Sequence, residues 1–390
     1  MYGWISNVIA AILLLVLVYR ILKDYKEGLL FYFAACLVGP YLIIGTTKVK
    51  FEMAAFLIVF VMAMLRGRFV LVIGRNRRTY GRVFLAIWFG LFSATTIFNL
   101  LGSAELSFFP SRIFGLFRFI FNLFILEKLM EDRAAYFREG KKVYRVFLIV
   151  NLPVLISQYM IPGTLQFYNT LFGVQDSAPY ANEIRVGFYT RGYGTSYSPT
   201  GVGMICAFIV AFFVMKYCLA REKDDIKLLA LGIIEGALSG SKMFAFSIII
   251  IIALSLVVLP IFNGGKSVAT NIRLLVGGSI FLGIAMLILM RFNQLDRLLN
   301  YFANPLEQLE SRYSSTGSIG RADKTVLVER FFGGYGATKK GTELIGDSMY
   351  YVLFHDIGLL GAIWYFGCLA VNFVRGIGKR DFITIVYVAL

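Results

Sequence analysis

The residues best suited to chemistry lie in two polar stretches of an otherwise apolar sequence. The first stretch, 185–201, reads RVGFYTRGYGTSYSPTG and carries Arg185, Arg191, Tyr193 and Tyr197. Guanidinium groups bind phosphate through paired hydrogen bonds, and flat aromatic rings can support sugar rings. The stretch therefore predicts a site for a phosphate and a sugar. The alternative interpretation is an aromatic belt at a membrane surface, with arginines that contact lipid headgroups.

The second polar stretch runs from Asn293 to Gly346 and is the longest in the chain. Arg312 and Arg321 stand there among Ser, Thr and Gly residues, and a Gly-Gly-Tyr-Gly segment around Tyr335 follows them. Long loops are usually functional or disordered, and the aromatic residues and spaced glycines argue against disorder. We predict that the two arginines bind an anion and that the segment around Tyr335 brings backbone donors close to a ligand.

An apolar helix is predicted directly after this stretch. Asp347, Tyr351 and His355 follow one another at steps of four, which places them along one face of that helix. A carboxylate at the mouth of the helix and an imidazole two turns deeper could act as a general base, or orient one. The alternatives are that Asp347 caps the helix and that His355 is a packing residue beside Asp356.

A third candidate is Lys242, which follows the turn Leu238-Ser-Gly-Ser. The turn predicts a helix that begins at Lys242, where exposed N–H groups already favour an anion. This arrangement suits a diphosphate. The alternative is a lysine that extends its side chain to the membrane surface.

Two ionisable residues, Arg118 and Glu235, fall inside apolar spans. Charges at that depth are costly unless they are paired or face a wet cavity, so each is a candidate for function. The alternative interpretation is structural, with Arg118 paired to an acid such as Glu235 or Glu105.

The elements that position these residues are predicted from hydropathy. The chain has 390 residues, 58% of them hydrophobic, and a mean hydropathy of +0.73, which lies outside the range of soluble domains. We expect an all-α, polytopic transmembrane helical bundle of about 11–12 spans, with residues 1–390 forming a single integral membrane domain. Apolar spans are predicted near 4–22, 29–45, 51–65, 83–101, 112–130, 143–161, 198–219, 226–239, 242–262, 272–290 and 347–374. A twelfth, too short to cross, runs from Phe382 to Leu390.

The charges indicate how these spans are oriented. The net charge is +16, and the Lys and Arg residues lie in short segments between spans, as topology signals do, so we predict no nucleic-acid partner. The segment 66–82 has six arginines and no acidic residue, which predicts a cytoplasmic location. Alternating spans from there place two large loops, 163–197 and 292–346, together on the outer side. Both polar stretches then share one face.

Metal and redox chemistry are not predicted. The four cysteines all fall inside or at the ends of apolar spans and read as small buried hydrophobic residues. His355 is the single histidine of the chain. We therefore expect no metal and no cofactor.

The order of these motifs resembles the O-antigen polymerase and O-antigen ligase superfamily of bacterial envelope glycosyltransferases. The resemblance covers about the last 170 residues and rests on Ser239-Gly-Ser-Lys242, Gly320-Arg321, Gly334-Tyr-Gly336, the helix opening at Asp347 and Ile357-Gly-Leu-Leu-Gly361. Two positions depart from the family pattern. Lys242 stands where arginine is common, and Asp347 stands where ligases show histidine, which favours a polymerase over a ligase.

The resemblance implies a GT-C-like, multi-pass protein of the bacterial inner membrane whose two large loops are periplasmic. The implied activity is transfer of a growing glycan from polyprenyl diphosphate to another lipid-linked oligosaccharide repeat unit, without a metal. Membrane lipids and a chain-length regulator protein are implied partners. The alternatives are an O-antigen ligase and, from another class, a flippase or exporter of lipid-linked sugars.

Roles for the candidate residues follow from this reaction. Departure of the diphosphate leaves negative charge, which prepositioned cations stabilise. We assign catalytic roles to Arg191 and Arg321 as such cations, and to Asp347 or His355 as the base that accepts the proton of the attacking hydroxyl. The residues expected to bind substrate are Arg185, Lys242, Arg312, Tyr193, Tyr197, Tyr335 and Tyr351.

Overall fold

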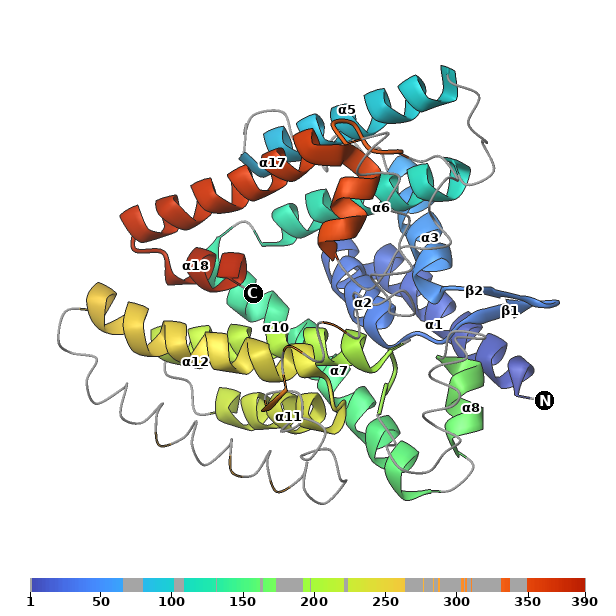
Figure 1. Cartoon of the computed structure of the whole chain (residues 1–390). Helices are drawn as coiled ribbons and strands as arrows, with labels where there is room; N and C mark the ends of the chain where they lie inside the picture. The colour runs from blue at the N-terminus through green and yellow to red at the C-terminus, as the bar shows by residue number, and fades with distance from the viewer. Residues whose placement is uncertain are drawn as a thin grey trace. The chain divides into compact units, whose positions relative to one another are not determined.

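The structure is a computed structural model, and its described residues form an almost entirely helical protein (Figure 1). It describes residues 2–65, 80–101, 109–130, 132–161, 164–172, 192–196, 198–220, 224–263, 331–336 and 349–389, and isolated positions between 276 and 310. The chain divides into two compact units. Unit 1 comprises Met1–Phe69, Glu127–Leu298 and Gly376–Leu390, and unit 2 comprises Val70–Leu126 and Leu299–Arg375.

Each unit is built mainly from helices. Unit 1 contains α1 (Gly3–Lys23), α2 (Tyr25–Val38), β1 (Leu42–Ile44), β2 (Thr47–Val49), α3 (Phe51–Leu65), α7 (Arg133–Met160), α8 (Thr164–Leu171), α10 (Pro199–Ala220), α11 (Asp224–Leu238), α12 (Lys242–Asn263) and α18 (Phe382–Ala389). Unit 2 contains α5 (Tyr80–Leu101), α6 (Phe109–Leu129) and α17 (Met349–Gly378), and the last residues of α6 and α17 extend past its boundaries. The prediction of an all-α protein is confirmed for the described residues, apart from one two-stranded hairpin.

The central helix of unit 1 is α10, which packs against α7, α11 and α12 (Figure 1). Of the most apolar stretch of α10, 67% is buried inside the protein, compared with 22% of the corresponding stretch of α1. The α10 helix therefore contacts protein on most sides, whereas α1 turns most of its apolar surface outward. The core around α10 consists of large apolar side chains such as Phe147 and Leu155 of α7, Ile209, Phe212 and Phe213 of α10, and Phe244 of α12.

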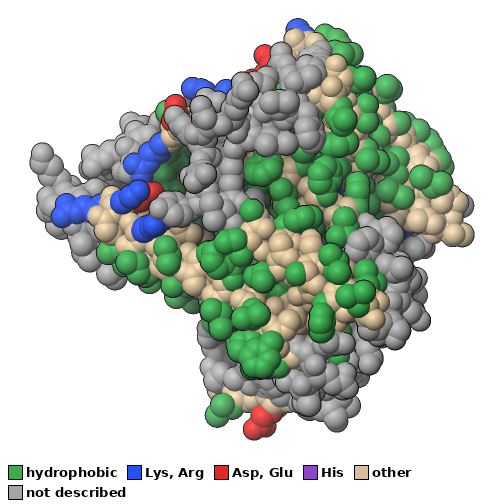
Figure 2. Space-filling model, turned by 90° about the horizontal axis from the view of Figure 1, so that it is seen from above, with side chains coloured by type: hydrophobic (Ala, Val, Ile, Leu, Met, Phe, Trp, Pro, Cys, Tyr) green, Lys and Arg blue, Asp and Glu red, His purple; other side chains and the backbone are tan. Residues whose placement is uncertain are grey.

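Four helices in the described part of the chain are long and apolar enough to cross a membrane. They are α1, α7, residues Pro199–Tyr217 of α10 and residues Phe354–Gly378 of α17. The shortest, with 19 residues, spans about 28 Å, close to the ~30 Å thickness of a bilayer's hydrocarbon core. Figure 2 shows a face on which hydrophobic side chains predominate among those coloured. These features support a membrane protein, and the full number of spans stays a prediction.

The structure differs from the predicted segments in several places, among them a span that forms a helix and a hairpin, and a loop that begins with a helix. The predicted span 29–45 is not one helix, because α2 ends at Val38 and the chain then forms the β1–β2 hairpin. The cause is Gly39-Pro40, since a proline disfavours helical geometry in the residue before it and lacks an N–H to donate. The predicted outer loop 163–197 also begins with a helix, α8.

Aspartate residues define where α2 and α7 begin. The Asp24 carboxylate accepts hydrogen bonds from the N–H groups of Lys26 and Glu27, at 2.9 and 3.3 Å. Asp132 accepts from the N–H of Ala135 at 2.6 Å. Each side chain satisfies a donor that the first turn of the helix leaves open, so both helices begin at a capped turn.

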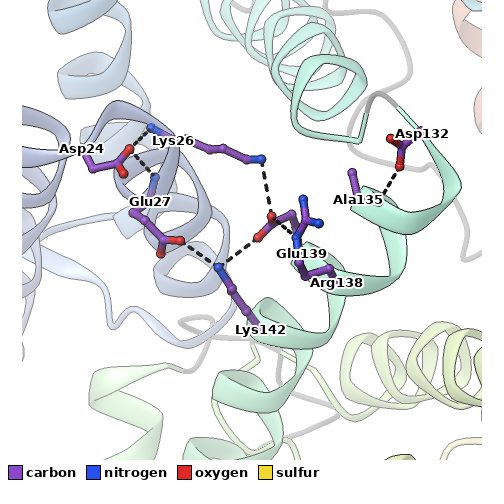
Figure 3. Close-up of polar contacts among 8 residues, drawn as sticks. All are labelled: Asp24, Lys26, Glu27, Asp132, Ala135, Arg138, Glu139 and Lys142. Carbon is purple, nitrogen blue, oxygen red and sulfur yellow. Dashed lines mark hydrogen bonds and ion pairs between the residues drawn. The ribbon is translucent and has the colours of Figure 1, made fainter. Parts of the chain in front are cut away.

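A group of charged side chains joins α2 to the first turns of α7 (Figure 3). Glu139 lies at its centre with only 4% of its side chain exposed. Its carboxylate lies 3.4 Å from the Lys26 amine, 2.9 Å from the Arg138 guanidinium and 3.1 Å from the Lys142 amine. Lys142 also pairs with Glu27 at 2.7 Å. The buried carboxylate is thus compensated by three cations.

A second ionic group joins α7, α10 and α11. The two carboxylate oxygens of Asp225 lie 2.7 Å from the Lys141 amine and 2.8 Å from the Lys216 amine. The Asp225 side chain is fully buried, and 6% of the Lys216 side chain is exposed. Because Lys141 lies on α7 within one turn of Glu139, both ionic groups lie at the same end of that helix.

The length of α7 separates this charged end from a second polar end. Glu139 and Gln158 are 19 residues apart on α7, which corresponds to about 28 Å along the axis. This distance is close to the thickness of a bilayer's hydrocarbon core, roughly 30 Å. Unit 1 therefore has a charged end and an opposite end, where Gln158 contacts the segment described next.

Candidate functional site

The segment 192–196, which follows Arg191 in the sequence, is held on one face of α7. Four consecutive backbone N–H groups donate to three α7 side chains: Gly192 to Tyr159 Oη at 2.8 Å, Tyr193 and Gly194 to Gln158 Oε1 at 3.0 Å each, and Thr195 to Asn151 Oδ1 at 2.7 Å. Asn151 and Gln158 are two helical turns apart, which brings both amides to the same face. The segment is consequently fixed by hydrogen bonds along its backbone.

Gly194 allows the segment to approach α7 this closely. Its φ is +54°, in the left-handed region that favours glycine. A Cβ atom added at this position would lie 1.9 Å from Asn151 Oδ1, far inside van der Waals contact. The glycine therefore allows both the turn and the hydrogen bond to Asn151.

The turn between α11 and α12 contacts the same segment. The Tyr159 hydroxyl that accepts from Gly192 also donates to the carbonyl oxygen of Leu238, the last residue of α11. Ser241 Oγ lies 3.5 Å from the N–H of Phe244, so it caps α12, and Lys242 is the first residue of that helix, as predicted. Tyr159 thus links two stretches that the sequence singled out separately, the segment after Arg191 and the turn before Lys242.

Tyr193 supports this arrangement from within the protein. Tyr193 is 4% exposed and packs with Leu171 and Phe172 at the end of α8. Burial raises the pKa of the Tyr193 phenol, and the nearby Tyr168 raises it further, so the hydroxyl stays protonated. The sequence-based expectation was a flat ring open to a sugar. In the structure this ring packs against the protein interior and helps to anchor the segment 192–196.

Replacing Tyr159 by phenylalanine is expected to loosen the segment 192–196. The change leaves the Gly192 N–H and the Leu238 carbonyl without the hydroxyl, and each buried group that loses its partner costs about 1–3 kcal/mol. Amide hydrogen exchange of a peptide covering 192–196 should become faster. Tyr168→Phe is the matched control, because the Tyr168 hydroxyl bonds only to Ser157 among the described contacts. Equal exchange in the two variants would contradict the role given to Tyr159.

In unit 2 the segment 331–336 docks on a break in α17. Gly358 has φ +59° and ψ −163°, which no helix contains, so α17 consists of two helical pieces. Four backbone hydrogen bonds cross the break: Tyr335 N–H to the His355 carbonyl at 2.6 Å, Gly336 N–H to Asp356 at 2.9 Å, Leu359 N–H to Phe331 at 2.8 Å and Leu360 N–H to Phe332 at 3.3 Å. The Gly-Gly-Tyr-Gly donors at Tyr335 and Gly336 were expected to face a ligand. They are used by the fold instead.

His355 is fully buried in this unit. Its Nδ1 lies 3.0 Å from Asp356 Oδ1, and its ring centre lies 5.2 Å from that of Tyr335, which is 3% exposed. This environment favours the packing interpretation of the histidine over the role of a general base. The Tyr335 ring likewise packs against the histidine. Tyr351 lies in α17, and its role in substrate binding stays a prediction.

Several predicted site residues lie outside the described residues: Arg185, Arg191, Tyr197, Arg312, Arg321 and Asp347. The predicted convergence of Arg191, Lys242 and Arg321 therefore stays a prediction. Glu105 lies outside them too, and the described partner of the Glu235 carboxylate is Asn151.

Sequence reasoning missed the α7 side chains that hold the segment 192–196. Asn151 and Gln158 are polar residues, seven apart, inside a predicted apolar span. Polar groups within a membrane helix usually face protein and make hydrogen bonds, so their spacing was the available signal. Within the described ranges, no three His, Cys, Asp or Glu side chains are grouped closely enough to hold a metal ion.

Comparison with known proteins adds no assignment. No protein-family model, no curated protein and no solved structure matches this chain.

Proposed function

We propose that this protein is a membrane glycosyltransferase that polymerises lipid-linked oligosaccharide repeat units at the periplasmic face of the bacterial inner membrane. The proposal is supported by the order of sequence motifs and by helices of membrane-spanning length. The observation that carries it is the link made by Tyr159, which fixes the residue after Arg191 to the turn before Lys242. One side chain thereby holds the residue that follows Arg191 and the residue at which the turn before Lys242 begins.

The proposed reaction needs such cations. The hydroxyl of one lipid-linked repeat attacks the anomeric carbon of the glycan on polyprenyl diphosphate, and the bond from that carbon to the diphosphate oxygen breaks. The electron pair leaves with the diphosphate, where Arg191, Lys242 and Arg321 stabilise the charge. Arg185 and Arg312 provide further positive charge. No metal is required, because arginine and lysine neutralise the leaving group.

Asp347 is our proposed base for the attacking hydroxyl. The alternative, His355, is fully buried and lies against Asp356 and the Tyr335 ring, which argues against access to a substrate. A base must come within hydrogen-bonding distance of the proton that it accepts.

The test is complementation of a deletion strain with single variants. Arg191→Ala and Lys242→Ala are expected to stop chain growth at normal protein level, and single lipid-linked repeats should accumulate at the outer face of the membrane. Lys227→Ala is the control. Lys227 is exposed near the start of α11, whereas Lys242 follows the other end of that helix. Normal long-chain product from both test variants would overturn the assignment of these residues.

The deletion strain also separates the alternative functions. Repeats trapped on the cytoplasmic side would indicate a flippase, and long polymer that is not attached to its acceptor would indicate a ligase. Reconstitution with one defined lipid-linked repeat in the presence of EDTA tests whether the reaction requires a metal ion. Loss of activity that added metal restores would contradict a metal-independent mechanism.

A further inference from the structure

A buried acid lies directly behind the segment that follows Arg191. Glu235 of α11 is fully buried, and its Oε2 accepts a hydrogen bond from Asn151 Nδ2 at 2.7 Å. No described atom forms a hydrogen bond with its other oxygen, Oε1. A buried carboxyl group with incomplete hydrogen bonding is unfavourable for the fold. Its presence calls for a role beyond packing.

The role concerns the orientation of the Asn151 amide. An amide has a donor end and an acceptor end, which only its hydrogen-bond partners distinguish. Glu235 Oε2 accepts a hydrogen bond from Asn151, so Glu235 holds the Asn151 NH₂ group toward α11. The amide oxygen then points to Thr195, where it accepts from the backbone N–H at 2.7 Å and lies 3.2 Å from the hydroxyl. If the amide were reversed, its NH₂ group would face the Thr195 N–H, and two donors would meet.

We propose that Glu235 is a positioning residue, which orients Asn151 so that the segment 192–196 is held in place for Arg191. The functional part of this inference rests on the proposed function, because it assigns Arg191 to the leaving diphosphate. The structural part stands alone. It states that Asn151 needs a hydrogen-bond acceptor at position 235 to keep the segment on α7.

The contrast between Glu235→Leu and Glu235→Gln tests the structural part. Leucine removes the acceptor and leaves the buried Asn151 NH₂ group without this partner, so thermal stability should fall only by what the loss of one hydrogen bond implies. Glutamine can still accept from Asn151 through its amide oxygen. A residue with only a packing role would leave the segment 192–196 unaffected in both variants. A positioning residue predicts a loosened segment in the leucine variant alone.

The measurement is amide hydrogen exchange on the full chain in lipid nanodiscs. In Glu235→Leu we expect exchange in a peptide covering 192–196 to be about tenfold faster, as loss of a hydrogen bond of ordinary strength implies. Glu235→Gln should stay within about twofold of the original protein, and so should the control Ser255→Ala, a buried change on α12. Exchange in Glu235→Leu at the original rate would overturn the inference.

A double variant tests the geometry by reversing the hydrogen bond. In Asn151→Asp with Glu235→Gln, the new amide at 235 can donate to the new carboxylate at 151, whose second oxygen can still accept from Thr195. Protection of the segment 192–196 should therefore be retained. Loss of protection in both this variant and Glu235→Gln, at normal thermal stability, would show that an acidic group at position 235 is required rather than a hydrogen bond to residue 151. That result would overturn the inference.

Enzyme kinetics separate this inference from the proposed function. With a defined lipid-linked repeat as substrate, Glu235→Leu should lower kcat about tenfold and change KM little, because Arg191 is assigned to charge that develops in the transition state. Glu235→Gln should keep kcat. Faster exchange in the leucine variant with unchanged kcat would support the positioning role and would overturn the assignment of Arg191 to the diphosphate.

Discussion

Gly358→Ala is expected to detach the segment 331–336 from α17. Gly358 has φ +59° and ψ −163°, a combination that is essentially restricted to glycine and that costs other residues about 1–3 kcal/mol. An added Cβ atom would also lie 2.4 Å from the Phe332 carbonyl oxygen and 2.6 Å from the Gly333 nitrogen. Both are backbone atoms, which cannot rotate away as a side chain can. The four hydrogen bonds across the break should therefore be lost together.

Gly367→Ala is the matched control in the same helix. An added Cβ at Gly367 meets nothing within 4 Å, and alanine is favoured over glycine in a helix by about 1 kcal/mol. Amide exchange at Tyr335 and Gly336 should rise strongly in the Gly358 variant and stay unchanged in the control. The same thermal unfolding and the same amide protection in both variants would show that the break at Gly358 does not hold the segment.

The positions of most described helices could be predicted from the sequence. The predicted span 51–65 coincides with α3, and the span 242–262 differs from α12 by one residue at its end. The span 198–219 lies within one residue of α10 at both ends. Long apolar runs leave few alternatives, because a chain in a bilayer must satisfy its backbone hydrogen bonds internally. Hydropathy was therefore sufficient at this level.

Local backbone chemistry limited the same approach. The span 29–45 is apolar throughout, but Gly39-Pro40 ends α2 and allows the hairpin. Gly358 lies inside an equally apolar stretch, and nothing in its composition reveals the break in α17. Hydropathy averaged over a stretch of residues does not detect a single residue that sets the backbone angles. Gly39-Pro40 is a local signal that a hydropathy average ignores, whereas the break at Gly358 follows from φ and ψ angles that the sequence leaves open.

The candidate site was only partly predictable for a different reason. The sequence identified Lys242 and the stretch around Arg191 as separate candidates, and the Tyr159 hydroxyl links the segment after Arg191 to the turn before Lys242. Such a contact joins residues 33 and 79 positions apart, which no local pattern contains. The aromatic residues show the same limit. Tyr193 and Tyr335 have the composition of a sugar-binding surface, but both rings are buried.

Asp225→Asn is expected to destabilise unit 1 strongly. The change removes the carboxylate that lies 2.7 Å from the Lys141 amine and 2.8 Å from the Lys216 amine. Removing one partner of a buried ion pair typically costs about 3–5 kcal/mol, because the remaining charge stays in a poorly solvated place. Lys216, with 6% of its side chain exposed, is the residue most affected. We expect a large drop in the thermal unfolding temperature, or loss of the protein from the membrane.

Two further variants test whether the loss of stability comes from leaving a buried charge unpaired or from losing any ion pair. Glu27→Gln breaks the Lys142–Glu27 pair, which has the same 2.7 Å separation but has both side chains nearly half exposed. Its effect should stay below about 1 kcal/mol. Adding Lys216→Met to Asp225→Asn should recover part of the stability, because it removes the buried charge that the first change left behind. A double variant less stable than Asp225→Asn would mean that Lys216 contributes through its other contacts rather than through Asp225.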